Sequence, residues 1–132
     1  VLGEKTYEDK MLPIILDLTG QVYRTAFDGR SLANECEKGV VDENRIWWVQ
    51  AEALVGFLNG YQLAPEHKEY LEAAKAQWEF IKEYVIDKRP GSEWFWDVNK
   101  DGQAVSGKPI VEPWKCPYHN GRMCIEVCRR KF

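Results

Sequence analysis

Residues 47–60, with the sequence WWVQAEALVGFLNG, decide the fold predicted for this chain. Apolar side chains recur there at helical spacing, which predicts a helix over residues 47–59, and Gly60 is suited to cap its C-terminus. Pro65 occupies a favoured first helical position, and a second apolar stripe predicts a helix over residues 65–87. That stripe comprises Leu71, Ala74, Trp78, Ile81 and Val85. Because so few residues separate the two helices, we expect them to fold back as an antiparallel hairpin.

The chain on either side of this hairpin alternates helices with turn-rich inserts. Apolar faces predict a helix over residues 7–27 and a last helix that begins near Asn120. The first insert predicts a short strand over residues 31–36, and the second predicts a strand over 93–98 with a return strand over 103–106. This order predicts an all-α fold with short β-hairpin inserts, roughly four helices in number, as part of a larger helical toroid.

The composition narrows the class of protein. The chain has 132 residues and a net charge of −3, which suits one domain. No basic run is paired with aromatic residues, which argues against a nucleic-acid partner. No apolar run approaches the ~20 residues of a membrane span, which argues against a membrane partner. Four cysteines in a Lys/Glu-rich chain of this size fit a reducing, cytoplasmic setting better than a disulfide scaffold.

The segment WKCPYHNGRMC, residues 114–124, holds the main candidate for acid–base chemistry. It contains His119, one of only two histidines, at the expected junction of loop and helix, with Trp114 five residues before it. An imidazole held there can move protons near neutral pH, although it can also serve as a hydrogen-bonded helix cap. The second histidine, His67, lies among charged residues and is expected to be exposed to solvent. Arg122 can either neutralise a carboxylate or bind substrate oxygens.

The cysteines of the same region allow a metal alternative. Cys116, His119, Cys124 and Cys128 offer zinc ligands, but their spacing matches no standard zinc pattern. We therefore favour thiols that are buried as small apolar groups, and we expect no metal. Residues 97–102 imitate the start of a calcium-binding EF-hand loop, but Lys108 stands where a carboxylate ligand is required, so a β-turn is favoured.

A second candidate constellation lies at the start of the helix over residues 47–59. Trp47 and Trp48 are adjacent, and helix neighbours point about 100° apart, so one indole should pack inward while the other faces a cavity. Glu52 follows Trp48 by one turn, which places an aromatic plate and a carboxylate on one face. Such a pair suits a sugar, because the C–H face stacks on the indole and the hydroxyls bond to the carboxylate. A core tryptophan pair with a solvated glutamate explains the pattern equally well.

Three ordered motifs carry a resemblance to a known family. The segments 47–52 (WWVQAE), 93–96 (EWFW) and 114–123 (WKCPYHNGRM) resemble the C-terminal third of the N-acylglucosamine 2-epimerase superfamily, and most closely its cellobiose 2-epimerase branch. The resemblance implies that residues 1–132 form a C-terminal fragment of a single (α/α)6-barrel epimerase domain. It also implies an isomerase that inverts C2 of a reducing-end glucose through a cis-enediolate, with no cofactor.

The resemblance also assigns expected roles to residues. His119 matches the more C-terminal of two catalytic histidines, whereas Trp48, Trp114 and Glu52 match residues near the sugar; which of Trp47 and Trp48 faces it stays open. The other functional histidines of the family have no counterpart here. Because two acid/base groups must act on opposite faces of one carbon, we expect the fragment alone to be inactive.

Other functions stay open at this point. The protein could be an N-acylglucosamine 2-epimerase or an aldose–ketose isomerase acting on mannose or glucose, since the same enediolate can be reprotonated at C1. A non-catalytic helical module that binds carbohydrate or protein is a further alternative. A piece of a barrel exposes apolar surface, so we expect the fragment to associate with itself.

Overall fold

A computed structural model describes residues 3–130. Four α-helices lie in this range: α1 (Lys5–Thr25), α2 (Trp47–Leu63), α3 (Lys68–Phe80) and α4 (Tyr118–Arg129). A π-helical turn, η1 (Ile81–Val85), extends α3. Two short antiparallel strand pairs complete the architecture: β1 (Glu35–Glu37) with β2 (Val40–Asp42), and β3 (Arg45–Ile46) with β4 (Asp97–Val98). The predicted fold class, all-α with short β-hairpin inserts, is therefore confirmed.

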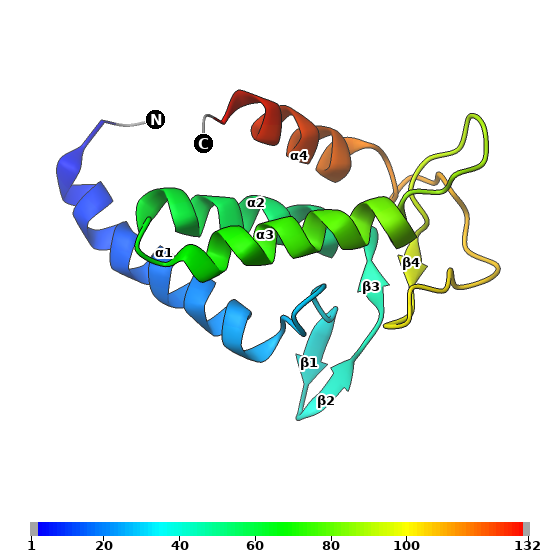
Figure 1. The fold of residues 1–132 in the computed structure, drawn as a ribbon, viewed down its shortest axis with the longest axis horizontal. Coiled ribbons are helices and arrows are strands. Elements are labelled where there is room, and N and C mark those ends of the chain that lie inside the picture. The colour runs from blue at the N-terminus through cyan, green and yellow to red at the C-terminus, as the bar shows by residue number, and fades with distance from the viewer. Residues whose placement is uncertain (1–2, 131–132) are drawn as a thin grey trace.

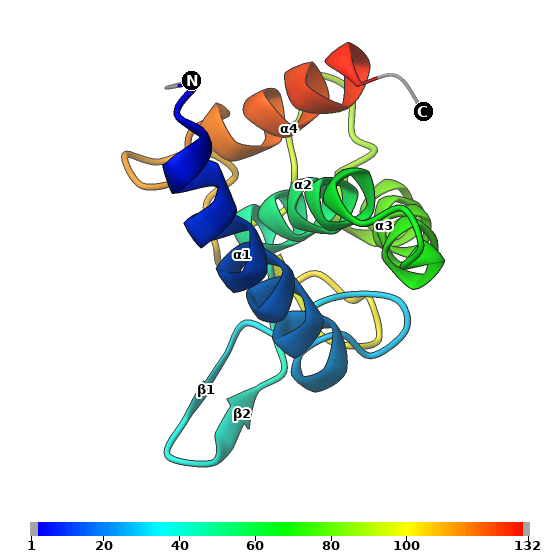
Figure 2. The same ribbon diagram turned by 90° about the vertical axis from the view of Figure 1, so that its left-hand side faces the viewer.

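Helix α2 is the centre of the molecule. Figures 1 and 2 show α2 and α3 side by side, with α1 crossing one side of the pair and α4 lying along the other side of α2. The expected antiparallel helix hairpin is thus present. The β1–β2 hairpin projects away from the helices at the end of the molecule opposite to α4 (Figure 2).

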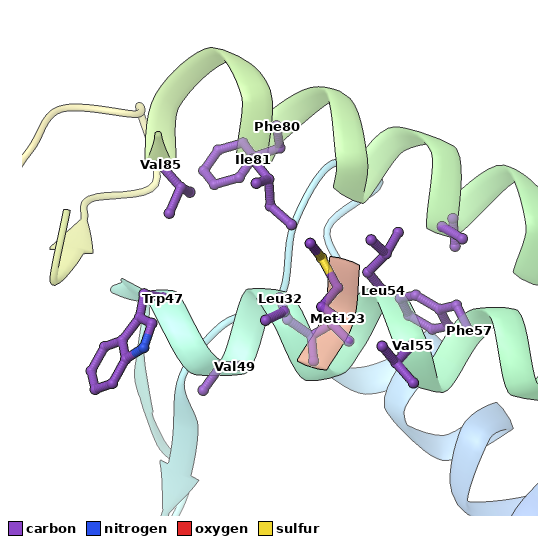
Figure 3. Close-up of a cluster of buried hydrophobic side chains, with 14 of the residues drawn as sticks. Leu32, Trp47, Val49, Leu54, Val55, Phe57, Phe80, Ile81, Val85 and Met123 are labelled. Carbon is purple, nitrogen blue, oxygen red and sulfur yellow. The ribbon is translucent and has the colours of Figure 1, made fainter. Parts of the chain in front are cut away.

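The hydrophobic core lies between α2, α3 and the segments that cover them. Phe57 of α2 and Phe80 of α3 are almost completely buried, and Met123 reaches into the same cluster from α4 (Figure 3). A buried amide pair crosses this core, because Gln77 Nε2 donates to Gln50 Oε1 over 2.9 Å. Gln50 in turn bonds the backbone N–H and C=O of Leu32 at 3.2 and 2.9 Å, which fixes the first insert to α2.

Helix α2 does not end at Gly60, so the predicted cap is wrong. The helix continues to Leu63, and Gly60 is buried against Thr19 of α1. A Cβ atom at Gly60 would lie 2.7 Å from Cγ2 of Thr19 and 3.1 Å from Cδ2 of Tyr70. The glycine is needed for the close approach of α1 rather than for a turn.

Helix α3 is shorter than the predicted range 65–87. Pro65 lies in the connection, where the His67 N–H donates to the Ala64 carbonyl (3.0 Å) and closes a turn before the helix begins at Lys68. At the other end the α-helix gives way at Ile81 to the π-helical turn, in which Ile86 N–H donates to Ile81 O (3.0 Å). The apolar stripe identified the helix, but hydrogen bonding at its ends determined its length.

The inserts contain less strand than the sequence predicted. In the first insert, pairing begins only at Glu35, and a turn at Lys38-Gly39 joins β1 to β2. In the second, only Asp97–Val98 forms a strand, and its partner is Arg45–Ile46 rather than the return segment, which contributes a single bridge at Ala104. Helix α1 begins and ends two residues earlier than predicted, and α4 begins at Tyr118 instead of Asn120. Within residues 3–130, no helix is long and apolar enough to cross a membrane.

Candidate functional site

Helices α2 and α4 bring a carboxylate, an imidazole and a guanidinium group together. Nδ1 of His119 lies 2.9 Å from Oε1 of Glu52, and Nη2 of Arg122 donates to Oε2 of the same carboxylate. His119 and Arg122 are three residues apart on α4 and therefore project from one face of it. Glu52 is on the first turns of α2. This packing of two helices creates a cluster that neither helix has by itself.

An indole completes this cluster. Trp48 is one helical turn before Glu52, and its ring centroid lies 5.8 Å from that of His119 with the planes inclined at 42°. The Trp48 side of α2 also borders a cavity of about 290 Å³ between α1 and α2, to which Glu52 contributes. Glu52 and His119 side chains are each 33% exposed, and Trp48 is 41% exposed. The groups can therefore reach a ligand from solvent while remaining held by the protein.

The contacts around His119 define what its ring can do. If Nδ1 carries the proton and donates to Glu52, Nε2 keeps its lone pair and can accept a proton from a ligand. The negative charge of Glu52 stabilises the imidazolium ion that such a transfer creates, and Arg122 holds the carboxylate in place. The ring is not a helix cap, because Pro117 precedes α4 and His119 lies inside its first turn.

Two other candidate residues lie apart from this cluster. Trp47 is 4% exposed and packs beneath Trp96, with ring centroids 4.8 Å apart, and the ammonium group of Lys115 lies 5.5 Å from its ring centroid. The expectation that one indole packs inward while its neighbour faces a cavity is confirmed, with Trp47 inside and Trp48 lining the cavity between α1 and α2. Trp114 is 84% exposed in the loop before α4.

The cysteines are not the buried thiols that the sequence predicted. All four are free and exposed. Cys124 and Cys128 lie on α4, which packs through Asn120 and Met123 instead, and Cys36 and Cys116 lie outside this helix. Cys124 and Cys128 line an apolar groove of about 500 Å³ between α2, α3 and α4, and partial burial in this groove raises the pKa of the Cys124 thiol. In residues 3–130, no three His, Cys, Asp or Glu side chains gather as a metal site, so the four residues of the zinc alternative do not converge on one point.

The exposed position of His67 agrees with the sequence interpretation. Its side chain is 48% exposed, and Nδ1 lies 2.8 Å from Oε1 of Glu69.

The part of the site that the sequence did not predict was the link between Glu52 and the α4 residues. The spacing of His119 and Arg122 signalled a shared helix face, but no local pattern showed which carboxylate would meet it. A second group, formed by Glu93, Lys115 and Asn120, was also missed.

Comparison with known proteins gives one consistent result. The model of the N-acylglucosamine 2-epimerase (GlcNAc 2-epimerase) family matches residues 16–120. The chain is 47% identical over 130 residues to a cellobiose 2-epimerase of Ruminococcus albus, covering 98% of this chain and 33% of that protein. It is 52% identical over 121 residues to a cellobiose 2-epimerase of Dictyoglomus turgidum, covering 92% of this chain and 31% of the relative.

Solved structures agree with these sequence matches. A crystal structure of a sugar epimerase from a ruminal bacterium superposes with a TM-score of 0.95 at 45% identity, over 99% of this chain and 33% of that one. A cellobiose 2-epimerase from Bacillus thermoamylovorans gives a TM-score of 0.82 at 43% identity, over 88% and 30% of the two chains. The chain thus spans about a third of the length of its relatives. The expected fold, part of an (α/α)6 barrel, is confirmed.

Proposed function

Because this chain belongs to the N-acylglucosamine 2-epimerase family, we propose that it is part of a sugar 2-epimerase that inverts C2 of a reducing-end glucose. Cellobiose is the proposed substrate, since relatives 47–52% identical to this chain are named cellobiose 2-epimerases. Residues 1–132 then form a C-terminal fragment of a single (α/α)6-barrel domain. The hydrogen bond between His119 and Glu52 is the single observation that best supports the chemistry.

The chemistry requires two proton transfers on opposite faces of one carbon. The sugar ring opens, the hydrogen on C2 leaves as a proton, and the carbonyl oxygen gains negative charge, which gives a cis-enediolate. Protonation of C2 from its other face yields the epimer. Nε2 of His119 is suited to one of these transfers, because Glu52 bonds the other ring nitrogen and stabilises the charged ring.

The aromatic residues take the binding roles in this proposal. Trp48 lies beside the imidazole and offers an exposed indole face on which a sugar ring can stack. Trp114 has an almost fully exposed ring, which suits the second sugar unit of a disaccharide. Trp47 is the weakest of the proposed contacts, because its ring is covered by protein. Glu52 acts on the sugar either directly or through His119.

The decisive experiment measures proton exchange at C2 in heavy water. The complete protein should incorporate deuterium at C2 of cellobiose and form glucosyl-mannose, whereas the 132-residue chain should do neither, because the second catalytic histidine that the resemblance implies has no counterpart in it. His119→Ala in the complete protein should abolish exchange while cellobiose still binds, and His67→Ala is the matched control. A ketose product would identify an isomerase instead. Cellobiose or protein binding that survives with no exchange at all would favour a non-catalytic module.

Two further properties belong to the proposal. The four free thiols support a reducing compartment, and we place the protein in the cytoplasm. One side of α1 exposes apolar side chains, among them Met11, Ile14 and Leu18, which supports self-association of the isolated chain. Light scattering that finds only monomers at high concentration would contradict the second property.

A further inference from the structure

An ion pair between buried Lys115 and partly buried Glu93 lies beneath the loop that carries Trp114 and the helix that carries His119. Lys115 is 1% exposed, although lysine is rarely buried without a partner. Its ammonium group donates to Oε2 of Glu93 and to the carbonyl oxygen of Ile110, the latter over 2.8 Å. The charge is therefore neutralised inside the protein by a carboxylate 22 residues away in the chain.

The same carboxylate also holds the start of α4. Nδ2 of Asn120 donates to Oε1 of Glu93, so the two oxygens of one side chain serve two different segments. Asn120 is 8% exposed and lies in the first turn of α4. The backbone N–H of Trp94 donates to Oε2 over 2.6 Å, which fixes the carboxylate relative to its own backbone. Glu93 thus has a partner for each oxygen and little freedom to turn.

The two anchored residues are the direct neighbours of two proposed site residues. Lys115 follows Trp114, and Asn120 follows His119. In each pair, the anchored side chain points into the protein and its neighbour stays accessible, with Trp114 84% exposed and the His119 side chain 33% exposed. Backbone geometry couples such neighbours, so fixing the buried member restricts where the accessible member can point.

The geometry points to Glu93 as a positioning residue that aligns His119 through Asn120 and Trp114 through Lys115. This inference rests on the proposed function, since it assigns a task within that site. Glu93 does not touch the reacting atoms and acts only through the two residues it holds. We call the contact with Asn120 the α4 arm and the contact with Lys115 the loop arm. The two arms predict different kinetic effects, because the α4 arm acts on the proton-transfer group and the loop arm acts on an aromatic binding surface.

The α4 arm is tested in the complete protein with Asn120→Ala, which removes the bond to Glu93 and keeps a good helix former. We expect kcat for cellobiose epimerisation to fall about tenfold or more, because small misalignments of reacting groups are costly, while KM changes by less than about threefold. The ¹⁵N chemical shifts of the His119 ring should also change, since they report which nitrogen carries the proton. Glu43→Gln, which alters an exposed ion pair with Lys100, is the control and should change neither measurement.

The loop arm is tested with the double variant Glu93→Gln/Lys115→Met, which removes both charges together and leaves no buried ion unpaired. The amide oxygen introduced by Glu93→Gln can still accept from Asn120, so we expect kcat to stay within about threefold while KM rises about fivefold or more. Neither test depends on the single variant Glu93→Gln, because Asn120→Ala tests the α4 arm and the double variant tests the loop arm.

An Asn120→Ala variant that lowers the thermal unfolding midpoint but keeps kcat and the His119 ring shifts would overturn the inference, because Glu93 would then be only structural. The test is separable from that of the proposed function. If the wild-type protein lacks epimerase turnover, the proposed function fails, and unchanged ring shifts in Asn120→Ala would overturn the positioning role independently.

Discussion

Nδ1 of His119 lies 2.9 Å from Oε1 of Glu52, although the two residues are 67 positions apart in the chain. The contact exists because α2 and α4 pack against each other, with Met123 of α4 buried in the core one turn after His119. Arg122 donates to the second oxygen of Glu52, so the two oxygens of this carboxylate contact two side chains from one face of α4. Its role is therefore open to a direct kinetic test.

Glu52→Gln in the complete protein should lower kcat roughly 100-fold, toward the low end of what general acid–base groups contribute. The amide keeps the shape but removes the charge that stabilises the imidazolium ion. Steady-state kinetics with cellobiose would measure the effect. The matched control is Glu69→Gln, whose partner His67 lies at a similar distance (2.8 Å) on the exposed surface.

The alternative role of Glu52 as a direct ligand of the sugar predicts a different pattern. A raised KM with kcat preserved would mean that Glu52 contributes to uniform binding and does not act through His119. The same experiment therefore decides between the two roles.

The two adjacent tryptophans should separate stability from binding. Trp47→Ala should destabilise the chain by about 3–5 kcal/mol, because a large buried side chain is lost from the core. Trp48→Ala should cost less than about 1 kcal/mol, as expected for a partly exposed side chain. In the complete protein, Trp48→Ala should raise KM for cellobiose roughly tenfold, which corresponds to about 1.4 kcal/mol of lost stacking.

Urea unfolding of both variants, together with the kinetics of Trp48→Ala, would check this separation. Equal losses of stability in the two variants would contradict it. An unchanged KM in Trp48→Ala would remove Trp48 from the proposed binding surface.

The sequence predicted the helices well because burial leaves a periodic record. The stripe over Leu71, Ala74 and Trp78 identified α3, although only Ala74 of the three is fully buried, while Leu71 and Trp78 are partly buried beside the core. The paired indoles correctly implied that one ring is buried and the other is not. Gly60 was misread because a glycine is favoured both at a helix end and where two helices approach closely. Only the position of α1 distinguishes these causes, and local sequence does not contain it.

The candidate site was predictable in its members but not in its connections. His119, Trp48 and Glu52 were found from residue type and spacing, whereas their contacts depend on how α2 packs on α4. The Glu93–Lys115 pair left no signal at all, because a lysine in a polar loop is ordinarily solvated. Buried ion pairs of distant residues have no periodic pattern by which a sequence could reveal them.

Acid should weaken the chain partly through Asp28. Burial acts to raise the pKa of Asp28, but the backbone N–H groups of Ser31 and Arg30 and the guanidinium of Arg45 outweigh it and hold the pKa below 3.8. A carboxylate whose pKa is lower in the folded state stabilises it above the unfolded pKa, and this contribution is lost as pH falls through the folded pKa. Arg45 is the buried partner, at 2.6 Å.

Asp28→Asn should therefore destabilise the chain by about 1–2 kcal/mol at pH 7, a modest value because the Asp28 side chain is 43% exposed. The difference from wild type should shrink as pH falls below 3.8, where the wild-type carboxyl also becomes protonated. Urea unfolding at several pH values would measure it, with Glu72→Gln in an exposed pair as control. A difference that does not depend on pH would contradict the assignment.

Gly60→Ala and Gly56→Ala should have opposite effects, although both lie inside α2. A Cβ at Gly56 meets nothing within 4 Å, so the variant should gain up to about 1 kcal/mol from helix propensity. A Cβ at Gly60 would lie 2.7 Å from Cγ2 of Thr19, so α1 must move or Thr19 must change rotamer.

Overpacking of this kind costs about 1–3 kcal/mol, which exceeds the propensity gain and makes Gly60→Ala destabilising. Urea unfolding of the two variants would measure the difference, and Thr19→Ser combined with Gly60→Ala should recover part of the loss by removing the methyl group that clashes. Stabilisation by Gly60→Ala alone would show that α1 is free to shift along α2, and that the glycine is not required for their close packing.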